Sequence, residues 1–400
     1  MRVNNIPDKI LEEFTVVKIF DTGGSSANTL LVREKKNNNQ CILKYATWGG
    51  IGSSGLPWLR AQSRRFQELG KIKDQKIKNS LPIIFGEYEE QSLFFYTMEY
   101  FPDSYPISSY CYQKKLNAAE ILNKVDVIID LLTRLYDIKT ITSPRDFICE
   151  AHIKRILNRT NLLTDKNSIV YYKALKNKPV IFPESRFDDL TDLFIEIKKH
   201  DFLYINGRKI KNLSALLPEI NNETIFNLLQ PNFLPKYYHG DSTLRNYLLS
   251  KTGVKIIDIR GTDLPNSVVS KIDIAYELGK IVRTFYLEII RANDFKLDLV
   301  KRSAEFYFDF SFGKSRSVSN FIDARNDFLD SVHKYQKRYR ILEMEKHLLL
   351  KILYAEAAHF IADAVNRIES DSSGKQTIAY YLLGLQLFDQ VLEKIKRHEK

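Results

Sequence analysis

Two acidic side chains and one amide are spaced in a way that suits phosphoryl transfer. Asp241 lies in the stretch YHGDSTLRNY, Asn246 follows in the same stretch, and Asp258 lies in VKIIDIRG. Phosphoryl transfer needs a carboxylate that orients the attacking hydroxyl and oxygen ligands that hold Mg²⁺ against the phosphates. The D-x-x-x-x-N spacing predicts that Asp241 is the catalytic base and Asn246 a metal ligand. Asp258 ends an apolar strand beside this loop and is expected to be the main Mg²⁺ ligand.

A β-hairpin is expected to bring these side chains together. The runs NYLLS and VKIIDI read as strands, and KTG between them reads as a turn. Asn246 would enter the hairpin and Asp258 would leave it, so both would reach the same end. Each residue also has a simpler interpretation, because an isolated Asp-to-Asn spacing is weak and Asn246 alone can cap a turn. His239 is expected to stabilise the loop rather than to act as an acid or base.

Residues 1–100 are expected to form a small lobe of five antiparallel strands. The helix LRAQSRRFQELGKIK should follow the third strand, with Pro57 near its first turn. The five strand-like runs are VVKIF, TLLVRE, CILKY, PIIFGEY and SLFFYTMEY.

Lys44, on the third of these strands, is expected to hold the nucleotide phosphates. Glu68 is the acid inside the following helix and is expected to position Lys44. The simpler interpretations are a surface lysine on a strand and an exposed glutamate on a helix.

The loop between the first two strands contains Gly23, Gly24, Ser25 and Ser26. Its backbone N–H groups are expected to contact the phosphates, because glycine has no Cβ to keep an oxygen away. A plain hairpin turn is the alternative.

Residues after 101 have the pattern of a larger, mostly helical part. Only 232–260 reads as β-structure again, and 140–235 is expected to be a long, mostly helical stretch. The expected helices cover 117–137, 150–163, 188–200, 342–368 and 376–396.

Composition limits the function classes. The chain has 400 residues and a net charge of +11, which suits anionic partners such as nucleotides or acidic sugars. The basic residues are spread along the chain without a long run, and no groove with stacking aromatics is visible, so a nucleic-acid partner is not expected. Three scattered cysteines, no signal-peptide pattern and no long apolar run predict a cytoplasmic protein without membrane insertion. Its oligomeric state is left open.

The stretch HGDSTLRN resembles the H-G-D-x-x-x-x-N motif of the aminoglycoside phosphotransferase and choline kinase family. IIDIRG is similar to the segment that replaces D-F-G of protein kinases in that family. IDIAYELGKI resembles its D-x-x-x-D-L-A-K segment, with Asp273 and Glu277 at the two acids and Gly279 in place of alanine. The sequences of these motifs are similar, in particular, to those of phosphotransferases associated with capsule and surface polysaccharides.

The resemblance implies an α+β, bilobal protein-kinase-like fold, with residues 1–100 as the nucleotide-binding lobe and 101–400 as the catalytic and acceptor-binding lobe. It implies ATP and Mg²⁺ as cofactors, adenine bound by the backbones of Glu99 and Phe101, and an acceptor pocket lined by 140–235 and the last helices. The expected reaction is phosphorylation of a small-molecule hydroxyl, on a sugar or sugar-like alcohol, and the surplus of basic residues suits an anionic acceptor. The alternatives are an aminoglycoside or choline-type kinase, a protein kinase, and a kinase-like binding protein with weak catalysis. A protein kinase is disfavoured because no D-F-G…A-P-E activation segment follows Asp258.

Overall fold

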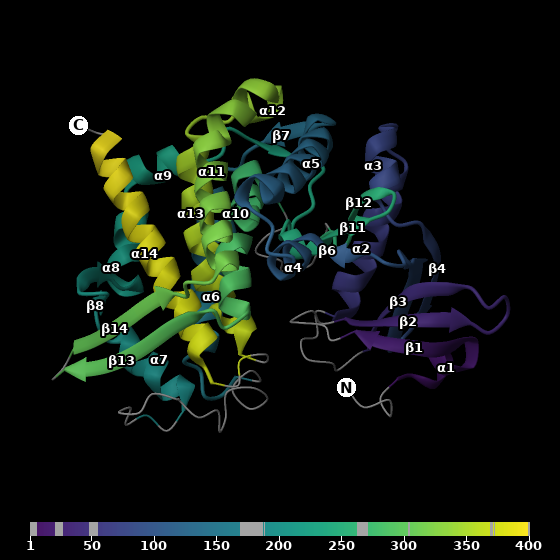
Figure 1. Cartoon of the computed structure of the whole chain (residues 1–400), viewed down its shortest axis with the longest axis horizontal. Coiled ribbons are helices and arrows are strands. Elements are labelled where there is room, and N and C mark those ends of the chain that lie inside the picture. Colours follow the sequence, from purple (N-terminus) through teal and green to yellow (C-terminus); the bar gives the residue numbers. More distant parts are fainter. Residues whose placement is uncertain are drawn as a thin grey trace. The chain divides into compact units, whose positions relative to one another are not determined.

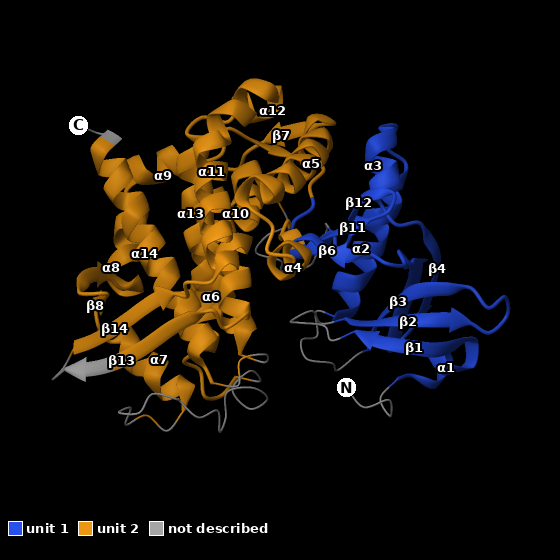
Figure 2. Cartoon of the chain, viewed as in Figure 1, with its two compact units in different colours: residues 1–107, 239–241, 245–270 blue, residues 108–238, 242–244, 271–400 orange. Residues whose placement is uncertain are grey.

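The chain folds into two compact units, shown in Figure 2. Unit 1 comprises residues 1–107, 239–241 and 245–270, and unit 2 comprises residues 108–238, 242–244 and 271–400. The computed structural model describes residues 6–20, 27–47, 55–168, 187, 189–261, 271–302, 305–368, 371 and 373–398.

Unit 1 is built on a five-stranded antiparallel sheet with the strand order β1-β2-β3-β5-β4 (Figure 1). The central strands β3 and β5 are buried along most of their length, whereas β4 at the edge is mostly exposed. The short helix α1 (Asp8–Glu13) precedes the sheet. The strands are β1 (Phe14–Phe20), β2 (Asn28–Glu34), β3 (Gln40–Thr47), β4 (Ile84–Glu90) and β5 (Leu93–Glu99).

Two helices, not the single one expected, connect β3 to β4. Helix α2 (Gly55–Gly70) packs against β3 and β5. Its buried residues Leu56, Leu59, Ser63 and Phe66 recur at helical spacing, which explains why this run forms an amphipathic helix. The second helix, α3 (Gln75–Ser80), is short and begins where the Asp74 side chain accepts a hydrogen bond from the Ile77 N–H at 3.0 Å.

The predicted hairpin is present as β11 (Tyr247–Ser250) and β12 (Gly253–Ile256). Strand β6 (Tyr105–Pro106) joins it to make a three-stranded sheet of order β12-β11-β6. By its contacts the hairpin belongs to unit 1, although it follows residue 101, where the large lobe is expected to begin.

Unit 2 is mostly helical. The helices are α4 (Ile107–Gln113), α5 (Ala118–Asp137), α6 (Lys154–Leu162), α7 (Leu190–Lys198), α8 (Leu213–Ile220), α9 (Glu223–Leu229), α10 (Ile274–Arg291), α11 (Arg316–Arg338), α12 (Arg340–Glu343), α13 (Leu348–Asp363) and α14 (Lys375–His398). Short π- and 3₁₀-helical segments of this unit lie at Cys149–Ile153 and Ala364–Arg367. Another 3₁₀ segment, Leu244–Asn246, has one residue in unit 2 and two in unit 1.

Helix α13 is the centre of this unit, and every residue in it except Leu349 is buried. Helix α10 approaches it closely at Gly279, where a Cβ would come within 2.6 Å of the Ala355 Cβ. This close approach gives a physical reason for glycine at a position where the resembling motif has alanine.

Unit 2 also contains strands that the sequence pattern did not lead us to expect. Strands β7 (Thr140–Thr142) and β10 (Phe233–Pro235) pair with each other. A four-stranded sheet of order β13-β14-β8-β9 is formed by β8 (Phe202–Ile205), β9 (Arg208–Lys211), β13 (Phe295–Arg302) and β14 (Glu305–Phe312). The expectation of β-structure in this part only at 232–260 is therefore wrong, because β7, β8, β9, β13 and β14 lie outside that range, whereas the described residues of 140–235 contain more helix than strand.

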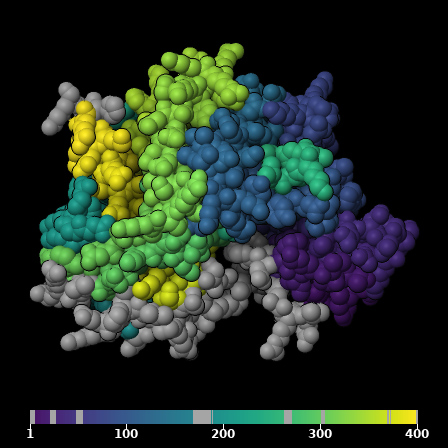
Figure 3. Space-filling view, in the orientation of Figure 1, coloured from purple at the N-terminus to yellow at the C-terminus, as the bar shows by residue number. Residues whose placement is uncertain are grey.

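Part of the surface of unit 2 is visible in Figure 3, where α11 and the β13–β14 hairpin lie on the displayed face. Strand β14 alternates accordingly, with Phe306, Phe308 and Phe310 buried and Glu305 and Asp309 exposed. None of the described helices combines the length and apolar character needed to cross a membrane.

The α+β class is confirmed. An antiparallel sheet with a helix after its third strand, followed by a mostly helical unit, is the architecture expected of the protein-kinase-like fold.

Candidate active site

Lys44 lies in the middle of the sheet of unit 1, paired with Thr29 on β2 and Tyr96 on β5. Only 7% of the residue is exposed. Its Nζ contacts the Asp258 carboxylate and donates to the Gln62 Oε1 at 3.3 Å. The structure therefore brings together Lys44 and Asp258, two of the residues singled out from the sequence.

Burial lowers the pKa of Lys44 to about 8, because removal from water disfavours the charged ammonium. The adjacent Asp258 carboxylate acts in the opposite direction, since an opposite charge favours the ammonium. With a pKa of about 8 the Lys44 ammonium is still mostly charged at neutral pH, and it lies against the Asp258 carboxylate.

The expected pairing of Lys44 with Glu68 is not what the structure shows. Glu68 is exposed and accepts a hydrogen bond from Arg65 at 3.2 Å. Glu68 lies six residues beyond Gln62, which is about 9 Å along the helix and about 120° around its axis. It is Gln62 that contacts Lys44, while Glu68 points to another side of α2.

Asp258 follows β12 and has a left-handed backbone, with φ of 56°. Few residues other than glycine adopt this conformation, although aspartate and asparagine do so more readily than others. About 40% of its side chain is exposed, so one part of the carboxylate contacts Lys44 and another part faces outward. Unusual backbone geometry at a polar residue is frequent at functional sites.

The loop with Asp241 is held by its own side chains. The His239 ring is buried, and its Nδ1 accepts a hydrogen bond from the Asp241 N–H at 3.1 Å. The Asn246 Nδ2 donates to the Asp241 carbonyl at 2.7 Å and to the Asp241 Oδ2 at 3.1 Å. Since the amide nitrogen is turned toward Asp241, the amide oxygen of Asn246 is turned away from it.

Two backbone hydrogen bonds join this loop to the Asp258 segment. The Ile257 N–H donates to the Asn246 carbonyl at 2.9 Å, directly beyond the paired residues of the β11–β12 hairpin. The Arg260 N–H donates to the His239 carbonyl at 2.7 Å. The segment that carries Asp241 and Asn246 is therefore hydrogen-bonded to the segment that carries Asp258.

The oxygen donors at this position fit Mg²⁺. The carboxylates of Asp241 and Asp258 and the amide of Asn246 are hard oxygen ligands, which this ion prefers. Among the residues that the structure describes, no group of three or more His, Cys, Asp or Glu is placed to hold a metal ion. Mg²⁺ usually takes only one or two protein ligands and completes its coordination with phosphate and water oxygens.

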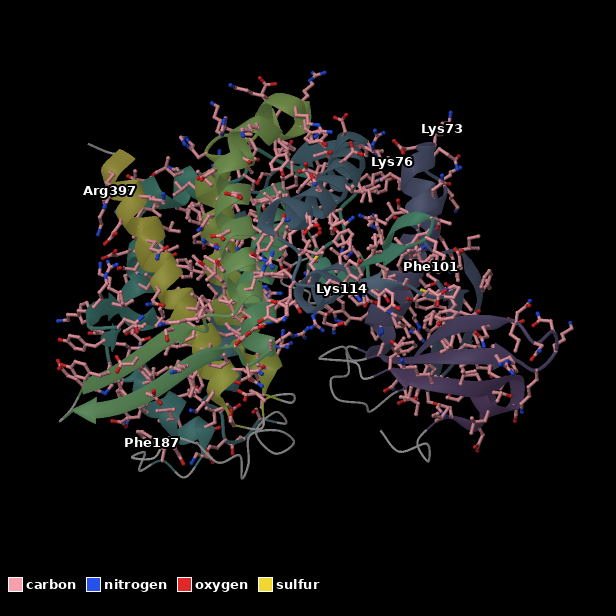
Figure 4. All side chains as sticks on the ribbon, viewed as in Figure 1. Lys73, Lys76, Phe101, Lys114, Phe187 and Arg397 are labelled. Carbon is pink, nitrogen blue, oxygen red and sulfur yellow. The ribbon has the colours of Figure 1, made fainter. Side chains whose placement is uncertain are left out.

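The hinge residues expected to contact adenine also belong to unit 1. The Glu99 N–H already donates to the Ile83 carbonyl at 2.9 Å. A backbone hydrogen bond between Glu99 and adenine would therefore have to use the Glu99 carbonyl as the acceptor. Phe101 is buried, with the Lys255 Nζ 5.1 Å from its ring centroid. Figure 4 labels Phe101 among the side chains of unit 1. Gly23, Gly24, Ser25 and Ser26, expected to cover the phosphates, lie outside the described residues.

The downstream motif has a structural role in unit 2. Asp273 caps α10 by accepting a hydrogen bond from the Tyr276 N–H at 2.7 Å. Glu277 is fully buried and accepts from the Ser242 Oγ at 2.7 Å. Both acids of this motif therefore have structural partners in unit 2.

Sequence reasoning missed Gln62 and Tyr96. The Tyr96 hydroxyl donates to the Gln62 Oε1 at 2.7 Å, beside Lys44. The strand register could have found Tyr96, because it lies directly opposite Lys44 on the neighbouring strand.

No protein-family model matches the chain, and no curated protein matches it. Similar solved structures include an aminoglycoside-3'-phosphotransferase of type VIII, with 13% identity, a TM-score of 0.36, and coverage of 84% of this chain and 98% of that chain. They also include an ethanolamine kinase from Plasmodium vivax, with 11% identity, a TM-score of 0.41, and coverage of 97% of this chain and 87% of that chain. At this level of similarity, the chemistry of this chain has to be judged from its own residues.

Proposed function

We propose that this protein is a phosphotransferase that uses ATP and Mg²⁺ to phosphorylate a hydroxyl group of a small molecule. The observation that supports it most is the set of contacts joining Lys44, Asp258, Asn246 and Asp241 within unit 1. A buried cation, two carboxylates and an amide on bonded segments are the groups that phosphoryl transfer requires.

In this proposal each side chain has one role. Asp241 accepts a hydrogen bond from the acceptor hydroxyl, orients its oxygen toward the terminal phosphorus, and takes its proton late in the transfer. The new bond joins the acceptor oxygen to phosphorus, and the bond that breaks releases the nucleoside diphosphate. Lys44 holds the nucleotide phosphates, and Asn246 and Asp258 hold Mg²⁺, which supplies charge neutralisation between the phosphates.

The remaining nucleotide contacts are proposed from the same architecture. The backbone carbonyl of Glu99 and the N–H of Phe101 would bind the adenine edge. The Gly23–Ser26 loop would cover the phosphates with its backbone N–H groups.

For the acceptor we propose a sugar or sugar-like alcohol bound by unit 2, including residues in 140–235. The net charge of +11 favours an anionic acceptor, such as a sugar phosphate or an acidic sugar, over a cationic one. ATP consumption measured across sugars, sugar phosphates, choline and aminoglycosides distinguishes these classes. Strong turnover of aminoglycosides alone would remove the sugar proposal.

The assignment of the base is tested with Asp241→Asn and Asp241→Ala. Both variants should lower kcat by several orders of magnitude, while ATP binding measured by calorimetry stays close to that of the unaltered protein. Near-normal turnover by Asp241→Ala on the true acceptor would exclude Asp241 as the base.

A matched control is Asp103→Asn, because Asp103 is an exposed aspartate in the same unit whose partner is the exposed Lys251 at 2.8 Å. Its kcat should stay unchanged. Nucleotide binding without turnover of any acceptor or water would instead favour a kinase-like binding protein with weak catalysis.

A further inference from the structure

Gln62 uses both ends of its side-chain amide at the candidate site. Its Oε1 accepts hydrogen bonds from the Lys44 Nζ at 3.3 Å and from the Tyr96 hydroxyl at 2.7 Å. Its Nε2 donates to the Ile259 carbonyl at 2.9 Å. One side chain of α2 is therefore bonded both to the phosphate-binding lysine and to the residue that follows the metal-ligand candidate Asp258.

Two further contacts hold α2 against the same segment. The Arg260 guanidinium lies 5.5 Å from the centroid of the Trp58 ring. Gly261 is so close to Ala61 that a Cβ at this position would collide with the Ala61 backbone. Residues 259, 260 and 261 thus each contact α2, and the backbone that leads out of Asp258 has little room to shift independently of the helix.

We propose that Gln62 is a positioning residue that couples Lys44 to Asp258. Through it, helix α2 would fix the position of the Lys44 ammonium relative to the Asp258 carboxylate. The inference rests on the proposed phosphotransferase function and adds to it a residue that the motifs do not contain. In protein kinases a glutamate of the corresponding helix pairs with the lysine. Here the expected acid, Glu68, contacts Arg65 instead.

The choice of an amide rather than a carboxylate follows from the two bonds. An ionised glutamate has acceptors only, so it can receive a hydrogen bond from Lys44 but cannot donate to the Ile259 carbonyl. It would also place a second negative charge beside the Lys44–Asp258 pair. Gln62→Glu therefore keeps the hydrogen bond from Lys44 and removes the one to the Ile259 carbonyl. Gln62→Met removes both hydrogen bonds with little change in side-chain length.

The test uses the full chain with Gln62→Met, Gln62→Glu and the matched control Gln67→Met. Gln67 is a glutamine of the same helix whose Nε2 donates to Glu87 at 3.0 Å, away from Lys44. ATP affinity is measured by calorimetry without and with Mg²⁺. The Mg²⁺ concentration for half-maximal activity and the kcat and KM for ATP are measured by ATP consumption, and unfolding temperature is measured in parallel.

We expect Gln62→Met to weaken ATP binding about tenfold to a hundredfold, the range for loss of a hydrogen bond to a charged group. Gln62→Glu should keep the affinity for Mg²⁺-free ATP within about threefold, because the bond to Lys44 is retained. It should raise the Mg²⁺ concentration for half-maximal activity by about tenfold or more, because the bond to Ile259 is lost. Gln67→Met should match the unaltered protein in all these measurements.

Three results would overturn the coupling. One is a Gln62→Met variant that behaves as Gln67→Met does. Another is a Gln62→Glu variant with an unchanged Mg²⁺ requirement. The third is a lowered unfolding temperature as the only effect of either substitution. If the unaltered protein binds no nucleotide with or without Mg²⁺, the proposed function fails first and the coupling fails with it. If it binds and turns over ATP normally while the Gln62 variants are unaffected, only the coupling fails.

Discussion

Substitutions at Asp258 separate the backbone requirement of this position from its charge. The residue has φ of 56°, its carboxylate contacts Lys44, and about 40% of its side chain is exposed. A left-handed backbone costs alanine about 1 kcal/mol or more, costs asparagine less, and costs glycine almost nothing. Loss of the contact with Lys44 adds no more than about 1 kcal/mol, because a partly exposed ion pair is screened by water.

We therefore expect Asp258→Ala to lower the free energy of unfolding by about 2 kcal/mol, and Asp258→Asn and Asp258→Gly to lower it by about 1 kcal/mol. All three should lose Mg²⁺-dependent ATP binding, because none retains an anionic oxygen ligand. Urea unfolding followed by tryptophan fluorescence measures stability, and calorimetry with ATP and Mg²⁺ measures binding.

Asp103 provides the control, because it also has φ of 56° and its contact with Lys251 is fully at the surface. The same three substitutions there should give the same order of stability and leave ATP binding unchanged. Equal stability of the alanine and glycine variants at position 258 would refute the backbone argument. Normal Mg²⁺-dependent binding by Asp258→Asn would refute the charge argument.

Two further predictions concern buried charges of unit 2. Arg325 donates to both carboxylate oxygens of Glu356, at 2.7 and 2.6 Å, so Arg325→Met alone should lower the free energy of unfolding by about 3 kcal/mol. Arg325→Met combined with Glu356→Leu should cost much less, and additive losses in a double-mutant cycle of urea unfolding would contradict this. Burial raises the pKa of Asp273 to about 7, so the folded chain holds this proton more tightly than the unfolded chain, and stability falls as the pH rises from about 4 through 7. Asp273→Asn keeps the cap on Tyr276 without the charge and should be more stable than the unaltered protein at pH 8, with the gain disappearing near pH 4. If urea unfolding shows that the stability gain of Asp273→Asn does not change with pH, the raised pKa of Asp273 is not its cause.

The proximity of Asp241, Asn246 and the Asp258 segment could be predicted because the D-x-x-x-x-N spacing and the hairpin are local in sequence. Asp241 and Asn246 share one loop, and the hairpin that carries Asp258 has a turn and two strand-like runs. The contact of Gln62 with Lys44 depends on which side of α2 faces the sheet. The buried positions Leu59 and Phe66 lie on the same side of the helix as Gln62, whereas Glu68 lies about 120° away from it, so an argument from residue type alone chose the wrong residue.

The sheet of unit 2 was missed for a different reason. The alternation in EFYFDFSF is a strand pattern, and attention to period 2 would have identified β14. Its pairing with β8 joins Tyr307 to Tyr204, and a contact between residues about a hundred positions apart leaves no local signal. The second helix before β4 is only one and a half turns long, too short for a helical period to be recognised.

The near-complete burial of α13 affects how the protein folds during synthesis. Part of its surface is covered by α14, with the Tyr354 and Phe388 ring centroids 5.4 Å apart and those of Phe360 and Tyr380 5.3 Å apart. While a ribosome still holds the residues of α14, α13 has emerged without that cover and presents bare aromatic and aliphatic surface to solvent or to chaperones. The core of unit 2 can therefore close only after α14 has been synthesised, and premature termination before α14 should yield an aggregation-prone product rather than a smaller folded protein.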